Sequence, residues 1–366
     1  MKPVLFTTGH APAYRVGALS RLHEREGIEV ALFGGPSRHG GADFDGDLPF
    51  PSRHAGAAEL GRLAASGRYR AVVCPTGGRL ALLATWAGAR SRGSPLILWA
   101  SLWAHPRSAA HAFSYLPLRR LYRSADAVVT YGPHVSAYVA RRGAGNVHIA
   151  PQSVDNEFWA GEDTAAPRDP RWPAAAATRF LFVGRPAPEK GLAVLRDAWR
   201  SAGLTPDAGA LVAVGVADDS PASLGGGSRG GRSGILSLPA MSPPQLRDLY
   251  AASDVLVVPS VPTPTFREPW GLVVNEAMNR GLAVIASDAV GAAAGGLVRD
   301  RETGLVTPAG DSRALARAIE ELASDPRLRT ELGAAGRRAV GAYTHEAWAE
   351  GFSRALATVG LSRHRW

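Results

Sequence analysis

The regular alternation of apolar and amphipathic segments constrains the fold of this chain most strongly. Short runs rich in Val, Ile and Leu, each of strand length, alternate with stretches whose apolar residues follow helical spacing. In the first half, the predicted strands are 4–8, 30–34, 71–75, 96–101, 127–130 and 147–150, and the predicted helices are 16–26, 55–65, 80–90 and 134–142. Strands of this composition are typically buried on both faces, so the pattern predicts a doubly wound parallel sheet.

The same alternation starts again after residues 158–177, a segment rich in Ala, Pro, Asp and Glu that is typical of a linker. The second series has predicted strands at 180–183, 211–215, 235–238, 254–259 and 282–287, and predicted helices at 193–201, 243–252 and 311–323, with two more at the end. Ser242 and Asp311 are the expected N-caps. Two such series predict two similar α/β domains, 1–170 and 171–344, with a cleft between them and ligands at the carboxyl ends of the strands.

Composition excludes several other classes of protein. The chain has 366 residues, 46% hydrophobic and 20% charged, which is typical of a globular protein large enough for two cores. The single cysteine, Cys74, excludes an intrachain disulfide and a metal site built from several cysteines. A strand is predicted directly after Met1-Lys2-Pro3, and no apolar run reaches the ~18 residues of a membrane-spanning helix. We therefore expect a cytoplasmic protein.

The charge of the chain is strongly basic, with a formal net charge of +9 at pH 7. Such a charge suits nucleic acid, a membrane surface or anionic substrates as partners. The basic residues are scattered along the sequence, which argues against a nucleic-acid-binding arm. Only Lys2 and Lys190 are lysines and all other basic residues are arginines, so the lysine at position 190 is a candidate for a specific role.

The stretch Ser260–Gly281 carries the most chemistry. It joins two buried strands through a Pro-rich loop and a helix that is predicted to begin near Trp270. Glu268 precedes the helix and Glu276 lies about two turns inside it. The backbone N–H groups at the helix start, which lack intrahelical partners, belong to Gly271, Leu272 and Val273. Two carboxylates beside these amides suit a polyhydroxylated, phosphorylated ligand. The alternative is that Glu268 is a solvent-facing loop acid and Glu276 an ordinary helix acid.

A second candidate site follows the first strand of the second series. Gly184 ends this strand, and Arg185 and Lys190 stand on the loop and at the start of the next helix. Two cations beside a helix N-terminus suit a diphosphate, with the lysine as a compact charge on phosphate. A surface salt bridge to Glu189 is the alternative.

These stretches resemble the retaining glycosyltransferases of family 4. The spacing of Glu268 and Glu276 matches the Glu-x7-Glu signature of that family, and the Gly184–Gly191 stretch resembles its diphosphate-binding segment. Leu249-Tyr250 and Thr303-Gly304-Leu305-Val306 also follow the course of the family. The resemblance extends over 178–343 and is weaker before it.

The resemblance implies a GT-B fold, with two Rossmann-like domains facing across a cleft. Residues 1–170, completed by a C-terminal helix within 345–366, would bind the acceptor, and 171–344 would bind a nucleoside diphosphate sugar. It further implies that Arg185 and Lys190 hold the diphosphate next to Gly184. Glu268 and the amides of Gly271, Leu272 and Val273 would hold the sugar, and Glu276 the ribose.

The resemblance also implies a reaction mechanism. Members retain the anomeric configuration, and a front-face mechanism is favoured, in which the departing phosphate takes the proton of the acceptor hydroxyl. Glu268 would then orient the sugar rather than attack it. Cations and a helix dipole neutralise the leaving group, so no metal and no cofactor are expected. The acidic loop at Asp43, Asp45 and Asp47 is interpreted as a solvated turn, with a cation site as the alternative.

The acceptor side is predicted from the ends of two strands in the first domain. Gly9 and His10 follow the first strand, where members of the family often have a Gly-rich loop, and this chain has a single glycine. Trp103 is a candidate sugar platform and His105 a candidate catalytic histidine near the reacting sugar, with a structural histidine as the alternative. Tyr14 and Arg15 are two more acceptor-side candidates. The alternative is that they form a surface pair at a helix start.

A basic segment suggests a further partner. Arg119, Arg120 and Arg123 alternate with apolar residues that would form a membrane-facing helix edge, at the inner face of the cytoplasmic membrane. An ordinary solvated helix face is the alternative. The apolar residues of this predicted edge are Leu118, Leu121 and Tyr122.

The sequence therefore predicts a glycosyltransferase that moves a sugar from a nucleoside diphosphate donor to an acceptor hydroxyl of a cell-surface polysaccharide, a glycolipid or a natural product. A GT-B sugar-nucleotide epimerase or hydrolase is the alternative enzyme. A basic nucleic-acid-binding protein is the alternative of another class, and the scattered arginines speak against it.

Overall fold

The computed structural model describes residues 2–34, 47–161, 176–216 and 235–359. These residues form two compact units. The first runs to Asp155 and resumes at Tyr343, and the second runs from Asn156 to Ala342.

The first unit is built on a parallel sheet of seven strands in the order β3-β2-β1-β4-β5-β6-β7. The central strands are buried along almost their whole length, as their Val- and Ile-rich sequences predict. The strands are β1 (Val4–Thr8), β2 (Ile28–Leu32), β3 (Ser52–His54), β4 (Ala71–Pro75), β5 (Leu96–Ala100), β6 (Ala127–Thr130) and β7 (Val147–Ile149).

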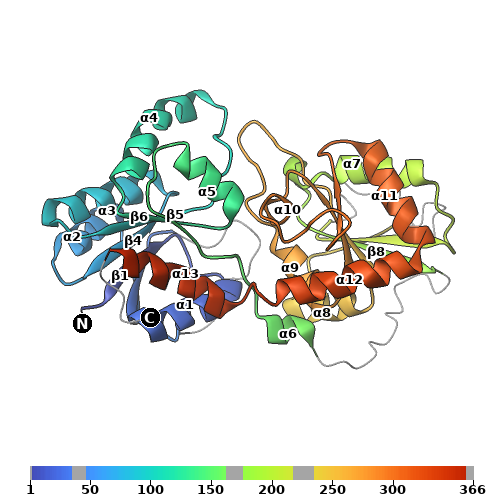
Figure 1. Cartoon of the computed structure of the whole chain (residues 1–366), viewed down its shortest axis with the longest axis horizontal. Helices are drawn as coiled ribbons and strands as arrows, with labels where there is room; N and C mark the ends of the chain where they lie inside the picture. Colours follow the sequence, from blue (N-terminus) through green and yellow to red (C-terminus); the bar gives the residue numbers. More distant parts are fainter. Residues whose placement is uncertain (1, 35–46, 162–175, 217–234, 360–366) are drawn as a thin grey trace. The chain divides into compact units, whose positions relative to one another are not determined.

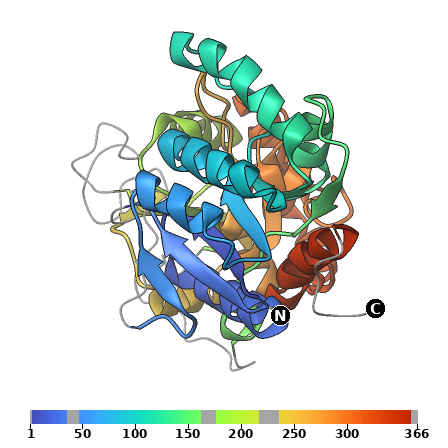
Figure 2. The same cartoon turned by 90° about the vertical axis from the view of Figure 1, so that its left-hand side faces the viewer.

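Helices cover both faces of this sheet (Figure 1). One face is covered by α1 (Ala13–Glu26) and α13 (His345–Thr358), and Figure 2 faces this unit from its end. The helices on the other face are α2 (Ala57–Ala65), α3 (Arg79–Arg92), α4 (Ala109–Ser124) and α5 (Pro133–Ala140).

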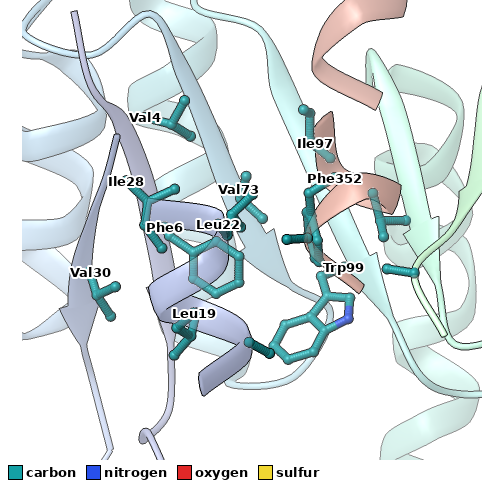
Figure 3. Packing of buried hydrophobic residues seen from close by; sticks show 14 of the residues in the cluster. Val4, Phe6, Leu19, Leu22, Ile28, Val30, Val73, Ile97, Trp99 and Phe352 are labelled. Carbon is teal, nitrogen blue, oxygen red and sulfur yellow. The ribbon is translucent and has the colours of Figure 1, made fainter. Parts of the chain in front are cut away.

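The core under α1 and α13 joins the two ends of the chain. Phe6 on β1 packs edge-on against Phe352 of α13 with ring centroids 5.5 Å apart, and Trp99 of β5 lies beside both rings (Figure 3). Trp348 and Phe352 are fully buried there. The last described helix is therefore part of the core of the first unit.

The second unit is built on a parallel sheet of six strands in the order β10-β9-β8-β11-β12-β13. Gln245 accepts from the amide of Ser242, and Asp311 accepts from Arg313 and Ala314, so both predicted N-caps are confirmed. The strands are β8 (Thr178–Val183), β9 (Gly209–Val214), β10 (Ile235–Leu238), β11 (Val255–Val258), β12 (Ala283–Ser287) and β13 (Leu305–Thr307). The helices are α6 (Asn156–Ala160), η1 (Pro188–Lys190), α7 (Leu192–Ala202), α8 (Pro243–Ala251), α9 (Leu272–Asn279), α10 (Gly291–Ala294), α11 (Ser312–Ser324) and α12 (Pro326–Val340).

The first residues of the predicted linker are helical. Residues 158–160 lie in α6, and Trp159 is buried against the ring of Tyr250 at 5.7 Å. Because α6 packs on α9, the second unit begins at Asn156, before the boundary expected between 170 and 171. The rest of the predicted linker, 162–175, and the low-complexity segment 218–234 lie outside the described residues.

Candidate functional site

The loop after β8 turns sharply and docks on the segment after β11. Gly191 has φ 71°, and a Cβ placed on it would lie 2.0 Å from the carbonyl oxygen of Pro259. The amide of Val261 donates to the carbonyl of Glu189 at 2.9 Å. Only glycine tolerates both the left-handed backbone and this close approach. The two loops at the carboxyl ends of neighbouring strands are thereby held together.

This docking brings together two residues far apart in the sequence. Lys190 Nζ lies 2.6 Å from Glu268 Oε2, and the side chains are 22% and 10% exposed. The alternative of a surface salt bridge between Lys190 and Glu189 is wrong. Instead, Glu189 pairs with Arg185 at 3.3 Å, and the Arg185 side chain is 44% exposed. The lysine thus joins the two predicted halves of the site, and the arginine stands beside it at the surface.

The start of α9 lies directly beyond Glu268. Gly271 has φ 91° and ψ 73°, so the chain enters the helix through a left-handed residue. Within the part of the chain that the structure describes, the amides of Gly271, Leu272 and Val273 donate no hydrogen bond. A buried carboxylate, a lysine and three donor amides therefore occupy one end of the sheet, an arrangement that suits hydroxyl groups and anions.

Trp270, which lies between Glu268 and the helix start, is held by two hydrogen bonds. The indole Nε1 of Trp270 donates to Asn275 Oδ1 at 2.7 Å, and the amide of Ala292 donates to the Trp270 carbonyl at 2.8 Å. Trp270 is 3% exposed and Asn275 is fully buried. Neither residue was singled out from the sequence, because an Asn in a helical pattern gives no signal of a distant partner.

The second glutamate of the signature lies deeper on α9. Tyr250 on α8 donates its hydroxyl to Glu276 Oε2 at 2.8 Å. Burial raises the pKa of the Glu276 carboxyl to about 7, and the hydrogen bond from Tyr250 opposes this shift. Tyr250 belongs to a stretch that matched the family, but its role as the partner of Glu276 was not predicted.

Two of the acceptor-side candidates lie at the start of α1. Tyr14 is exposed, whereas Arg15 is 5% exposed and donates to the side-chain oxygen of Gln152. The Arg15 guanidinium also lies 5.5 Å from the Trp99 ring and 5.3 Å from that of Trp348. The alternative of a helix-start surface pair is therefore wrong for Arg15.

The other acceptor-side candidates follow β1 and β5. Gly9 directly follows β1, its carbonyl accepts from the Gly34 amide at 2.7 Å, and His10 is half-buried beside it. Trp103 packs edge-on against His134 at 5.2 Å.

The candidate catalytic histidine packs toward α4 and α5. His105 Nδ1 lies 3.3 Å from the hydroxyl of Tyr138, and its ring contacts that of Tyr115 at 5.2 Å. These contacts give the ring a packing role, and its catalytic role stays a prediction.

The described part of the chain shows neither a metal-binding cluster nor a membrane-spanning helix. Among the residues described, no three His, Cys, Asp or Glu side chains are placed to share a metal ion. Asp43 and Asp45 lie outside the described residues, and Asp47 is exposed. No described helix has the length and apolar character needed to cross a bilayer.

The prediction that Leu118, Leu121 and Tyr122 form an exposed, membrane-facing edge of α4 is wrong. Leu121 and Tyr122 are 5% and 0% exposed, and Leu118 packs against the core. Among the α4 side chains that the structure describes, the most exposed large apolar ones are instead Phe113 and Leu116, at 84% and 68%. Leu118, Leu121 and Tyr122 face inward because they fill the space between the helix and the sheet.

Known proteins and one family model match parts of this chain. Residues 174–339 match the family model described as Glycosyl transferases group 1. A D-inositol 3-phosphate glycosyltransferase of Rhodococcus erythropolis is 37% identical over 117 residues, 32% of this chain and 25% of that protein. A phosphatidyl-myo-inositol mannosyltransferase of Mycobacterium leprae is 33% identical over 200 residues, 54% of this chain and 51% of that protein. The matched region thus spans a quarter to a half of these relatives.

Similar solved structures extend over almost the whole chain. A sucrose-phosphate synthase from Thermosynechococcus elongatus has a TM-score of 0.72 at 22% identity and covers 98% of this chain and 99% of its own. The Anabaena protein HepE, solved with UDP and glucose, has a TM-score of 0.71 at 18% identity and covers 98% and 100%. At such identities the likeness shows the fold.

Fold and site define the class: this is a GT-B protein with two Rossmann-like domains, as the sequence predicted. Residues 174–339 of its second unit match the model of the group 1 glycosyl transferases, so the resemblance to glycosyltransferases is confirmed over this region.

Proposed function

We propose that the protein is a retaining, metal-independent glycosyltransferase that moves a sugar from a nucleoside diphosphate sugar to an acceptor hydroxyl. The observation that carries this proposal is the contact of Lys190 with Glu268 beside the three donor amides at the start of α9, within the region that matches the group 1 model. The site combines cations for a diphosphate with acceptors and donors for sugar hydroxyls.

The proposed roles follow from the chemistry of each group. Lys190 and Arg185 would neutralise the charge that grows on the leaving diphosphate, with the start of α9 as a further electropositive group. Glu268 would accept from sugar hydroxyls and orient the ring. Glu276 would accept from the ribose. The departing phosphate would take the acceptor proton on the front face, so the protein needs no nucleophile and no cofactor in this proposal.

The acceptor is proposed to bind the first unit through Gly9, His10, Tyr14, Arg15, Trp103 and His105. The relatives' names mention D-inositol 3-phosphate and phosphatidyl-myo-inositol, which are both phosphorylated polyols. The basic chain, with its net charge of +9, suits an anionic acceptor of this kind. A polysaccharide, a glycolipid or a natural product carrying such a group fits the proposal.

Product analysis tests the reaction. The protein is incubated with UDP-, GDP-, ADP- and dTDP-sugars and a panel of polyol and lipid acceptors, with and without EDTA, and the anomeric signals of the product are followed by NMR. We expect one donor to give a product with retained configuration, at a rate that EDTA leaves unchanged. An inverted product, or complete loss of activity with EDTA, would contradict the mechanism.

The alternative enzyme is a GT-B sugar-nucleotide epimerase or hydrolase. It predicts turnover of the sugar nucleotide at full rate when no acceptor is present. The proposed transferase predicts a rate that rises with the concentration of acceptor. The alternative of a nucleic-acid-binding protein predicts tight binding with a steep salt dependence.

We further propose that the outer stripe of α4 contacts anionic lipid at the inner face of the cytoplasmic membrane. Phe113, Leu116, Arg120 and Arg123 share one side of the helix, and its sequence has no acidic residue. Arg119 borders the same stripe. Exposed apolar residues next to arginines favour a bilayer surface, where each arginine contributes about 1 kcal/mol.

Vesicle sedimentation tests this contact. We expect binding to vesicles with anionic lipid and none to neutral vesicles, and Arg120→Ala/Arg123→Ala should weaken it by roughly thirtyfold, the equivalent of about 2 kcal/mol. The matched control is Arg327→Ala, an exposed arginine of the second unit. Equal binding of both variants would reject the contact.

A further inference from the structure

One buried hydrogen bond lies between the two glutamates of the signature. Asn275 stands on α9 one residue before Glu276, is fully buried, and accepts from the Trp270 indole at 2.7 Å. Trp270 in turn stands two residues after Glu268 and one before Gly271. The bond therefore connects the body of the helix with the loop that carries the first glutamate and the donor amides.

We propose that Asn275 is a positioning residue for the sugar end of the donor site. It fixes Trp270, and Trp270 fixes the backbone that presents Glu268 and the amides of Gly271 to Val273. This inference rests on the proposed function, because it concerns how that site is held in shape.

The loop needs such a support. No helix or strand is found between Val258 and Leu272, so regular hydrogen bonding does not set the conformation there. The Trp270 residue is held through its side chain by Asn275 and through its carbonyl by Ala292. A rotation of the indole would break this hydrogen bond between two buried groups, and a buried polar group that loses its bond costs about 1–3 kcal/mol. Small errors in the placement of a binding group lower affinity strongly, so a fixed loop has functional value.

If packing alone held the loop, the polar pair of Trp270 and Asn275 would not be needed. Asn is a poor helix former, and a buried amide must find partners. Phe and Leu would fill the same volume without any polar group to satisfy. The polar pair instead favours one orientation of the indole, because the hydrogen bond to Asn275 forms in that orientation.

The support continues to the back of α9. Asn279 Nδ2 donates to the Asn275 carbonyl at 2.9 Å and to Asn156 Oδ1 at 3.0 Å. Asn156 Nδ2 donates to the carbonyl of Val340 at 3.4 Å. Asn156 opens the second unit and Val340 ends α12, so the chain of amides anchors α9 near both ends of this unit.

Calorimetric titration of the full chain tests the inference. The probes are UDP, GDP, ADP and dTDP and their glucose or mannose conjugates, because a nucleotide alone does not reach the sugar end. We expect Asn275→Leu to weaken binding of the sugar nucleotide about tenfold, the loss of one hydrogen bond, with little change for the nucleotide alone. Asn275→Asp keeps an acceptor oxygen for the indole and should restore most of the difference.

Two further variants separate positioning from general stability. Thr303→Val removes two other side-chain hydrogen bonds of this unit, one donated by Thr303 to the Leu297 carbonyl and one accepted from the Arg299 amide. It should leave the ratio of the two affinities unchanged. Trp270→Phe removes the donor, so Asn275→Leu should have no further effect on the ratio in that background.

The inference is overturned if Asn275→Leu weakens nucleotide and sugar nucleotide equally, or if its effect on the ratio persists in the Trp270→Phe background. If the wild-type chain binds nucleotides without any preference for a sugar conjugate, the proposed donor function fails together with the inference.

Discussion

The contact between Lys190 and Glu268 explains why a lysine stands at this position in a chain that otherwise uses arginine. The ammonium is a compact charge on a flexible stem, and it reaches Glu268 Oε2 at 2.6 Å from a tight turn. Its remaining donors can turn toward a second anion. The Glu268 residue is 8% exposed, and the lysine compensates for part of the hydration that its carboxylate loses on burial.

A double-mutant cycle tests this dependence. Lys190→Met leaves a buried carboxylate without its cation and should lower the free energy of unfolding by about 1–3 kcal/mol. Adding Glu268→Gln removes the stranded charge and should recover part of that loss. Urea unfolding of the two single variants and the double variant gives the result. Strictly additive losses would show that the two side chains do not interact.

The Glu276 carboxyl is expected to make both the stability of the fold and nucleotide binding depend on pH. Its pKa in the folded protein is raised from 4.5 to about 7 by burial, so the folded protein holds a proton that the unfolded chain loses near pH 4.5. This carboxyl therefore lowers stability as pH rises from 4.5 to 7, and Glu276→Gln should be more stable than wild type at pH 8. The same protonation should weaken nucleotide binding below pH 7, because a carboxylate accepts ribose hydroxyls better than a carboxylic acid.

Thermal unfolding and nucleotide titration from pH 5 to 8 check both effects. A binding constant that stays flat in wild type over this range would contradict the role of the ionised Glu276. The Glu276→Gln variant serves as the matched control, since its binding should not vary with pH for this reason.

At this scale the sequence singled out the charged residues of the proposed donor site but not their partners. The spacing of Glu268 and Glu276 and the rarity of lysine were visible in the sequence. The contacts of Trp270 with Asn275 and of Tyr250 with Glu276 were not, because they depend on which faces of two elements meet. The same reason applies to Arg15, whose aromatic neighbour Trp348 comes from the far end of the chain.

At the scale of elements, the loop after β8 holds the proposed donor site together. The turn from Gly184 to Gly191 places its last residue against the carbonyl of Pro259. The contact sets how close the loop after β8 comes to the loop that leads to Glu268. The geometry of the proposed site therefore depends on the backbone contact between these two loops.

Gly191→Ala tests this dependence. A Cβ there would lie 2.0 Å from the Pro259 oxygen, so the loops must separate, and we expect a loss of stability above the ~1 kcal/mol of left-handed strain together with weaker nucleotide binding. Gly203→Ala is the control, because Gly203 has φ 59° but its Cβ would meet nothing closer than 4.0 Å. Differential scanning calorimetry and titration compare the two. Equal effects would contradict the docking role of Gly191.

Elements with a strong apolar pattern were predicted well and short exposed elements were missed. The strand 235–238 and the helix caps at Ser242 and Asp311 lie where the sequence placed them. The strand β3 was missed because all three of its residues are exposed at the sheet edge. The helix α6 was missed because its short sequence lies at the start of a segment with linker composition.

At the scale of the whole molecule, the chain crosses between the units twice. The first unit is completed by α13, which packs on α1, β6 and β7. Its buried face includes Trp348, Phe352 and Leu356. Residues at the two ends of the sequence thus share one core, a long-range relation that local pattern does not reveal.

Truncating a core side chain of α13 tests its contribution. Phe352→Ala should lower the free energy of unfolding of the first unit by about 3–5 kcal/mol, because the ring is fully buried against Phe6 and Trp99. Phe113→Ala, on an 84% exposed side chain of the same unit, should change it by less than about 0.5 kcal/mol. Urea unfolding followed by tryptophan fluorescence measures both. Similar midpoints for the two variants would contradict the placement of α13.

The central claim is that the loops around Lys190 and Glu268 bind a nucleoside diphosphate sugar. Isothermal titration of wild type and Lys190→Ala with UDP-, GDP-, ADP- and dTDP-sugars tests it most directly. We predict saturable binding of at least one sugar nucleotide by wild type, and a dissociation constant raised about a hundredfold in the variant, the effect of removing one charge-stabilising group. Absence of binding by wild type, or equal binding by both proteins, would contradict the claim.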